Sequence, residues 1–205
     1  MKRLIGLAIA LLMCVAGPAL AQDYPARPIR ILVPYAPGGI SDIAARIVGA
    51  KLTEAWGQQV VIENRPGANG FIAVTDAARA APDGYTLVMV TTGNVAVNPA
   101  LFKDVPYDVE RDLAPMTATL AQEGAGDISA SNWTALLAPK GTPQPIIDKL
   151  SAKVVEILNM PDVKTRFGAG GVSTIPSTPA ELEAKIKREL ATYRLVIEKS
   201  NVRLD

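Results

Sequence analysis

The chain has 205 residues, 49% of them apolar, and a formal net charge of +1. That length suits one domain or slightly more, with enough apolar side chains for a packed core. Histidine is absent and Cys14 is the single cysteine, so Ser-His-Asp and Cys-His catalysis and histidine zinc sites are excluded. A near-neutral charge without a basic block argues against nucleic acid or an anionic membrane as partner. Carboxylate pairs or a lysine base stay open as catalytic groups.

Residues 1–21 have the pattern of a secretory signal peptide. A positive start at residues 2–3 is followed by an apolar run over 4–15 and by the small-residue segment 18–21, which predicts cleavage before Gln22. The run is shorter than the ~20 residues that a membrane-spanning helix needs, so a retained anchor is disfavoured. The signal peptide predicts a periplasmic mature chain without a membrane anchor. Because cleavage removes two cations and the cysteine, that chain is expected to have a net charge of −1 and no thiol.

Residues 30–90 alternate between predicted strands and helices. In chain order these are a strand over 30–34, a helix from Ser41 to Gly57, a strand over 59–63, a helix over 71–80 and a strand over 85–90. Ser41 is expected to cap the first helix and Gly57 to end it. The apolar residues of that helix are expected to share one face: Ile43, Ile47, Leu52 and Ala55. The alternation predicts a parallel sheet with right-handed crossovers.

Ligands of such sheets bind at the carboxyl ends of the strands. The loops that begin at Pro34, Asn64 and Thr91 follow the three predicted strands, so we expect them to crowd one edge, which is the candidate site. Gly38 and Gly39 lie in the first loop. Without side chains, they allow backbone N–H groups beside the helix start to face an anion. A plain tight turn is the alternative explanation of this glycine pair.

The second half of the chain is less regular. A strand is predicted over 133–138, a turn over 139–143 and a helix from about Thr142 to Asn159. Residues 178–181 (Thr-Pro-Ala-Glu) form a capping box. The helix that follows places these apolar residues on one stripe: Leu182, Ile186, Leu190, Tyr193 and Ile197. Between the halves, residues 114–130 have no helix or strand period and are interpreted as a linker.

Three motifs stand in an order that is typical of a known family. They are Tyr35-Ala-Pro-Gly-Gly-Ile-Ser-Asp42, Glu63-Asn-Arg-Pro-Gly-Ala-Asn-Gly70 and Pro82-Asp-Gly-Tyr-Thr-Leu87. With shorter matches at 98–99, 107–108, 112–115 and 131–143, they resemble the substrate-binding proteins of tripartite tricarboxylate transporters, also called the Bug family. The resemblance covers most of the mature chain.

The resemblance implies a periplasmic-binding-protein-like (type II) α/β fold. Its expected form is a Rossmann-like lobe with a mostly parallel sheet flanked by helices. It also implies a periplasmic receptor that holds a small carboxylate at the first loop and presents it to the membrane subunits of an uptake system. It implies no cofactor and no metal.

The second lobe of that family is largely missing. After residues 112–115 the chain passes almost directly to 131–143, a shortfall on the order of a hundred residues, the size of a small domain. The expected organisation is a signal peptide (1–21), a first segment of lobe 1 (22–116), a shortened connection (117–130) and a C-terminal segment that returns to lobe 1 (131–205).

The residues expected at the ligand are Tyr35, Ala36, Pro37, Gly38, Gly39, Ser41, Asp42, Thr91, Thr92 and Asn94. The Asp42 carboxylate would repel an anion, so its expected role is to organise the loop. Thr91, Thr92 and Asn94 offer hydroxyl and amide donors, with an ordinary polar loop as the alternative. Arg65 is interpreted as a brace between loops and Trp133 as a core or hinge residue.

The sequence therefore predicts an exported carboxylate-binding protein that is impaired by an internal truncation. Three alternatives stay open: a remnant without affinity, a periplasmic adaptor or sensor that binds a protein partner, and an exported α/β enzyme that uses carboxylates. The enzyme is the least favoured, because Asp42 alone lies near the candidate site as an acid or base.

Overall fold

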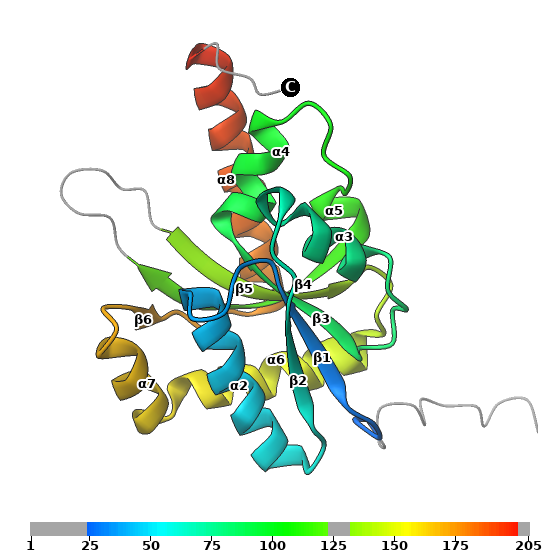
Figure 1. Ribbon diagram of the computed structural model, residues 1–205, viewed down its shortest axis with the longest axis vertical. Helices are drawn as coiled ribbons and strands as arrows, with labels where there is room; N and C mark the ends of the chain where they lie inside the picture. The colour runs from blue at the N-terminus through cyan, green and yellow to red at the C-terminus, as the bar shows by residue number, and fades with distance from the viewer. Residues whose placement is uncertain (1–23, 123–131, 201–205) are drawn as a thin grey trace, which may run out of the picture.

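The computed structural model describes residues 24–122 and 132–200, and the predicted signal peptide lies outside them. A six-stranded sheet lies between two layers of helices (Figure 1). The elements are β1 (Ile29–Val33), α2 (Ile40–Trp56), β2 (Val60–Asn64), η3 (Ala68–Gly70), α3 (Phe71–Ala78), β3 (Thr86–Thr91), the π-helix η4 (Gly93–Val97), α4 (Asn98–Leu101), α5 (Val109–Asp112), β4 (Leu113–Gln122), β5 (Asn132–Pro139), α6 (Gln144–Asn159), α7 (Pro161–Gly168), β6 (Ser173–Thr174) and α8 (Pro179–Ser200). Over these ranges, no helix is long and apolar enough to cross a membrane.

The strand order of the sheet is β2-β1-β3-β5-β4-β6. β1 pairs in parallel with β2 and β3, as the strand and helix alternation predicts. The pairs β3–β5, β4–β5 and β4–β6 are antiparallel, so β1 to β4 share one direction and β5 and β6 run the other way. The α/β class with flanking helices is confirmed, and the parallel pairing holds for the first three strands.

Both faces of the sheet are covered, so successive residues of a strand enter different cores. In β1, Ile31 and Val33 pack on the side of α2, α6 and α7. Leu32 lies between them in the chain and packs on the side of α3 and α8. Figure 1 shows these two helical layers on opposite sides of the strands.

Residues 113–122 form a strand where the sequence predicts a linker. β4 pairs with β5 along its whole length, and the register is irregular between Pro115 and Thr117 and between Ala118 and Leu120. These irregularities break the period of two by which a strand is recognised. The linker interpretation of residues 114–130 is therefore wrong for 114–122, and the part of the expected connection at 117–122 belongs to the sheet. The rest of the predicted linker, 123–130, lies outside the described residues.

The start and the buried face of α2 also differ from expectation. Gly39 is the N-cap, so Ser41 lies inside the first turn and does not cap the helix. The residues that the helix buries include Ala44, Ala45, Val48, Gly49 and Leu52, whereas Ile43 is 46% exposed. A Cβ added to Gly49 would lie 3.1 Å from Ile62 Cδ1. Small residues thus bring α2 close to β2, which the positions of large apolar residues do not reveal.

The predicted helix ends are confirmed at two places. Gly57 has φ +67°, and its N–H donates to Thr53 O at 2.9 Å. In the capping box, Thr178 N donates to Glu181 Oε2 (2.8 Å) and Glu181 N donates to Thr178 Oγ1 (3.2 Å). The first three residues of the α8 stripe are buried and the last two are half-buried, namely Leu182, Ile186 and Leu190, then Tyr193 and Ile197.

Candidate functional site

The loops that follow β1, β2 and β3 meet at one edge of the sheet, as the sequence predicts. Asn64 Nδ2 donates to Tyr35 O at 3.1 Å, and the Tyr35 hydroxyl lies 2.8 Å from Thr91 Oγ1. Asn94 Nδ2 donates to Asn69 O at 3.2 Å. We call this part of the molecule the carboxyl edge; it comprises residues 34–42, 64–70 and 91–94.

The first of these loops leaves the N-terminus of α2 open. Residues 36–39 are exposed, and the N-cap Gly39 has no side chain with which to cap the helix. Gly38 has φ +89°, a conformation that glycine adopts without a steric penalty. The first N–H groups of a helix lack intrahelical acceptors and carry partial positive charge. They can therefore receive an anion.

Asp42 organises this loop from a buried position, as expected. Its side chain is 3% exposed and pairs with Arg46, whose Nη2 lies 2.9 Å from Asp42 Oδ1. Asp42 Oδ1 also accepts from Asn64 Nδ2 (2.9 Å), and Oδ2 accepts from Gly38 N (2.9 Å) and Arg46 Nε (3.0 Å). Burial alone would raise the pKa of the Asp42 carboxyl, but the hydrogen bonds from Arg46, Gly38 and Asn64 outweigh burial and lower it. The carboxylate therefore stays ionised and neutralised.

One expected donor is already used. The N–H of Gly38 points at Asp42, so it is not available to a ligand in this conformation. Pro37 has no N–H at all. The backbone donors that the loop can offer are those of Ala36, Gly39 and the first turn of α2, including Ser41.

Thr91, Thr92 and Asn94 are buried and bonded within the protein, which favours the polar-loop alternative. Asn94 is 0% exposed, and its Oδ1 accepts from Thr91 N (2.9 Å) and Thr91 Oγ1 (3.1 Å). Thr92 Oγ1 accepts from Trp133 N at 3.2 Å. Trp133 itself is 1% exposed, which confirms it as a core residue. These three polar side chains therefore stabilise the buried part of the carboxyl edge through bonds within the protein.

Four further residues shape the edge and are not among the residues expected at the ligand: Arg46, Asn64, Asn69 and Tyr107. The Tyr107 hydroxyl donates to Asn94 O at 2.7 Å, and burial raises the pKa of Tyr107, so the phenol remains a donor. The sequence signal for Asn64 was its place at the end of a predicted strand. Nothing in the spacing of Tyr107 pointed to the edge, because it lies 13 residues beyond its partner.

Arg65 braces the second loop, as expected. Its Nη1 lies 3.0 Å from Asp76 on α3, and its Nη2 lies 3.1 Å from Glu63 on β2. Arg30 also binds Glu63, at 2.6 Å. The Arg30 guanidinium, and secondarily that of Arg65, lowers the pKa of Glu63 to about 2. These ion pairs lie beside the carboxyl edge and fix the base of its second loop.

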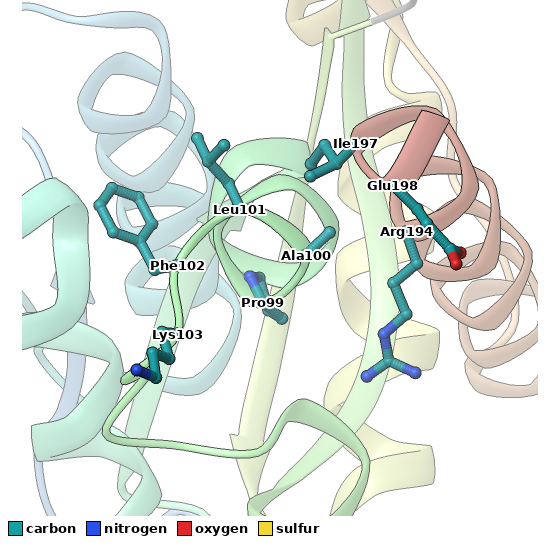
Figure 2. A pocket seen from close by; sticks show the side chains of 8 residues that line it. All are labelled: Pro99, Ala100, Leu101, Phe102, Lys103, Arg194, Ile197 and Glu198. Carbon is teal, nitrogen blue, oxygen red and sulfur yellow. The ribbon is translucent and has the colours of Figure 1, made fainter. Parts of the chain in front are cut away.

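A hollow of about 410 Å³ lies elsewhere, between residues 99–103 and the end of α8. Figure 2 shows Arg194 and Glu198 extending from α8 on one side of the hollow, and Phe102 and Lys103 on the far side of the 99–102 turn. Its charged side chains do not converge on one point, so we do not assign it as the binding site. Among the residues that the structure describes, no group of three or more acidic side chains could hold a metal ion.

Residues 44–119 match the model of the tripartite tricarboxylate transporter family receptor. A UPF0065 protein of Bordetella bronchiseptica is 44% identical over 116 residues, which cover 57% of this chain and 35% of the relative. BugT of Bordetella pertussis is 42% identical over 104 residues, covering 50% of this chain and 32% of the relative. The chain thus spans about a third of the length of these relatives.

A UPF0065 protein of Agrobacterium vitis aligns at 26% identity over 303 residues, covering 89% of this chain and 87% of the relative. That aligned stretch is longer than this chain of 205 residues. The alignment therefore passes through sequence of the relative that has no counterpart here.

Solved structures share the fold. A structure described as a periplasmic transporter has a TM-score of 0.80 at 25% identity, over 89% of this chain and 100% of that chain. A Rhodopseudomonas palustris protein with adipate has a TM-score of 0.78 at 18% identity, over 88% and 99%. MatC from the same organism, with bound malate, has 0.77 at 22% identity, over 85% and 100%. Over residues 44–119, then, this chain is similar to the tripartite tricarboxylate transporter family receptor, and it shares its fold with the solved structure described as a periplasmic transporter.

Proposed function

We propose that the chain is exported to the periplasm, where it binds a small carboxylate at the carboxyl edge for a tripartite tricarboxylate-type uptake system. The observation that carries this proposal is the open N-terminus of α2. It lies behind the exposed loop 36–39 and has no side chain that caps it. Backbone N–H groups and the helix dipole can bind a carboxylate there without an arginine.

The charge balance of the edge supports an anionic ligand. Asp42 is the acidic residue of the first loop and helix turn, and Arg46 neutralises it at 2.9 Å. Asn64, which completes the contact with Asp42, is uncharged. The partial positive charge of the helix start is therefore not cancelled by a free carboxylate, so an incoming anion meets net attraction.

We further propose that one wall of the cleft is missing. The extra aligned sequence of the Agrobacterium vitis relative supports an internal truncation. Two large apolar side chains at the helix starts of this edge, Ile43 on α2 and Ile72 on α3, are 46% and 47% exposed. Exposed apolar residues beside a binding loop are consistent with a surface that a second lobe covers in longer relatives. A carboxylate bound to one wall keeps part of its water, so the affinity is expected to be low.

Thermal melting of the exported protein, which we expect to begin at Gln22, tests the proposal. The ligand panel contains mono-, di- and tricarboxylates and includes adipate and malate, the acids named for two structural neighbours. At a hundredfold excess over Kd, a ligand adds about 2.7 kcal/mol to the free energy of unfolding. That corresponds to a rise in Tm of about 5–10 °C for a chain of this size.

Gly39→Asp sharpens the test, because it places a carboxylate of the protein's own at the N-cap. Gly39 has φ −74° and ψ 166°, which aspartate adopts freely, and an added Cβ would meet only Ala36 O at 3.7 Å. The variant should melt at or slightly above the wild-type temperature and lose the shift caused by the acid. Gly168→Asp carries the same charge change on α7, where an added Cβ meets nothing within 4 Å, and should keep the shift.

A cooperative melt that no acid in the panel shifts would contradict carboxylate binding and favour a remnant or a protein-docking role. A shift that survives in Gly39→Asp would place the ligand elsewhere than the start of α2.

A further inference from the structure

The structure assigns a positioning role to Asn64: its side-chain amide fixes the first loop in the form in which the backbone can receive a carboxylate. Asn64 is the last residue of β2, and it is not among the residues expected to touch the ligand. The inference deepens the proposed function, and its ligand-binding readout rests on that function.

The backbone of Asn64 is held by the sheet. It stands opposite Val33 in the parallel register of β1 and β2, and the next residue, Arg65, donates its N–H to Val33 O at 2.8 Å. The side chain of Asn64 therefore starts from a fixed point at the strand end and reaches to the loop that leaves β1.

The amide of Asn64 uses both of its N–H groups and its oxygen. Nδ2 donates to Tyr35 O (3.1 Å) and to Asp42 Oδ1 (2.9 Å). Oδ1 accepts from Arg46 Nη2 at 3.0 Å. Because its partners on one side are acceptors and its partner on the other side is a donor, the amide has a single favourable orientation. Neither aspartate nor leucine could make the same set of bonds.

The bond to Tyr35 O sets the direction of the next peptide group. In a planar trans peptide, C=O and N–H point in opposite directions, so the N–H of Ala36 points away from Asn64. Gly38 N–H is bonded to Asp42 and Pro37 has none. Ala36 is thus the donor of the exposed loop whose orientation Asn64 controls, beside the N–H groups of the helix start.

Amide hydrogen exchange of the unliganded protein tests this role without depending on any ligand. Asn64→Leu keeps the approximate size of the side chain and its neutrality but removes all three bonds. We expect exchange over residues 36–41 to accelerate about tenfold, while amides of β3 and α6 exchange as in the wild type. The matched control is Asn159→Leu at the end of α6, outside the carboxyl edge, which removes one exposed amide bond, to Val155 O at 3.0 Å. It should leave the loop unchanged.

Unchanged exchange in the loop of Asn64→Leu would overturn the inference, and so would a uniform acceleration throughout the sheet, which marks a purely structural residue. If Asn64→Leu does not fold cooperatively, Asn64→Ser, which leaves room for water, is measured in its place under the same criteria. Where the wild type binds an acid, Asn64→Leu should weaken its Kd about tenfold and Asn159→Leu should not. If the wild type binds none, the proposed function fails, and the exchange result still decides the role of Asn64.

Discussion

The parallel and antiparallel parts of the sheet use polar side chains differently. In the parallel part, β1 to β3, Asn64 and Asn94 lie at or beyond the strand ends and join separate loops. In the antiparallel part, Trp133 Nε1 on β5 donates to Glu189 Oε2 on α8 at 2.7 Å and joins the sheet to the helix layer. Bonds of the first kind set the shape of a surface, and bonds of the second kind hold layers together. Substitutions should therefore lower overall stability most in the antiparallel part and disturb the site most in the parallel part.

The largest loss of stability is expected from Trp133→Ala. Trp133 is 1% exposed, and Lys185 Nζ lies 5.3 Å from its ring centroid. Removing a buried aromatic side chain of this size leaves a cavity and costs about 3–5 kcal/mol. Urea unfolding measures the loss. Trp56→Ala, at the half-buried end of α2, is the control and should cost clearly less. Equal costs would contradict the dominant contribution assigned to the fully buried Trp133.

Gly70→Ala should have the next largest effect, at the carboxyl edge itself. Gly70 has φ +86°, and an added Cβ would lie 2.4 Å from Asn94 Nδ2 and 3.0 Å from Pro34 Cβ. Left-handed strain costs about 1–2 kcal/mol, and displacing the Asn94 amide from Asn69 O adds about 1 kcal/mol. Gly57→Ala has similar strain, with φ +67° and nothing within 4 Å. Chemical unfolding measures the loss of stability in each variant, and the extra loss in Gly70→Ala is the cost of the steric clash. Equal losses would mean that the edge is loosely packed.

The location of the carboxyl edge could be predicted because it depends only on topology. Parallel strands joined by helices bring their following loops together, and the bonds of Asn64 and Asn94 confirm that they meet. Which partner each donor and acceptor of the edge bonds to could not be predicted. Whether Gly38 N–H faces a ligand or Asp42 depends on side-chain geometry in three dimensions, which spacing does not contain.

The remaining misses have the same kind of cause. The sequence predicts a linker in place of β4, because the register irregularities of this strand break the period of two. The buried face of α2 differs from the predicted one, because alanine and glycine pack closest to the sheet, while Ile43 is exposed at the open edge. Hydrophobic periodicity finds large apolar residues and regular strands, and both exceptions lie where the packing is set by small residues or bulges.

Asp42→Asn should lower stability by about 2 kcal/mol at neutral pH, because hydrogen bonds to a charged group are strong. Both Asp42 oxygens accept hydrogen bonds, so either orientation of an asparagine amide would set a donor against a donor. Thermal or urea unfolding measures the loss. Asp148→Asn, exposed on α6, should change stability little.

The same variant predicts a pH dependence. The pKa of Asp42 is below its usual value of 3.8 in the folded protein, so its stabilising contribution is complete above that value. The contribution is lost as the pH falls through the lower folded-state pKa. The stability difference between wild type and Asp42→Asn should thus be constant from neutral pH to about pH 5 and shrink below the usual value of 3.8. Glu63, with a pKa of about 2, is present in both proteins, so its contribution to the pH dependence of stability cancels in the difference. A difference that grew in acid would contradict the assignment.

The smallest effect is expected where both members of a buried polar pair are replaced in the antiparallel part. The Thr119 and Thr134 hydroxyls lie 2.6 Å apart inside the sheet, and the two residues are 0% and 2% exposed. Thr119→Val or Thr134→Val alone leaves one hydroxyl without its partner and should cost about 1–2 kcal/mol. The double variant removes both polar groups, keeps the shape of both side chains and should be within about 0.5 kcal/mol of the wild type. A double-mutant cycle by urea unfolding measures the coupling. At the carboxyl edge the corresponding double variant, Tyr35→Phe with Thr91→Val, should not recover in this way, because Asn94 Oδ1 also accepts a hydrogen bond from this hydroxyl pair and would lose that donor. Recovery at both places would mean that the edge bonds, like those inside the sheet, serve packing alone.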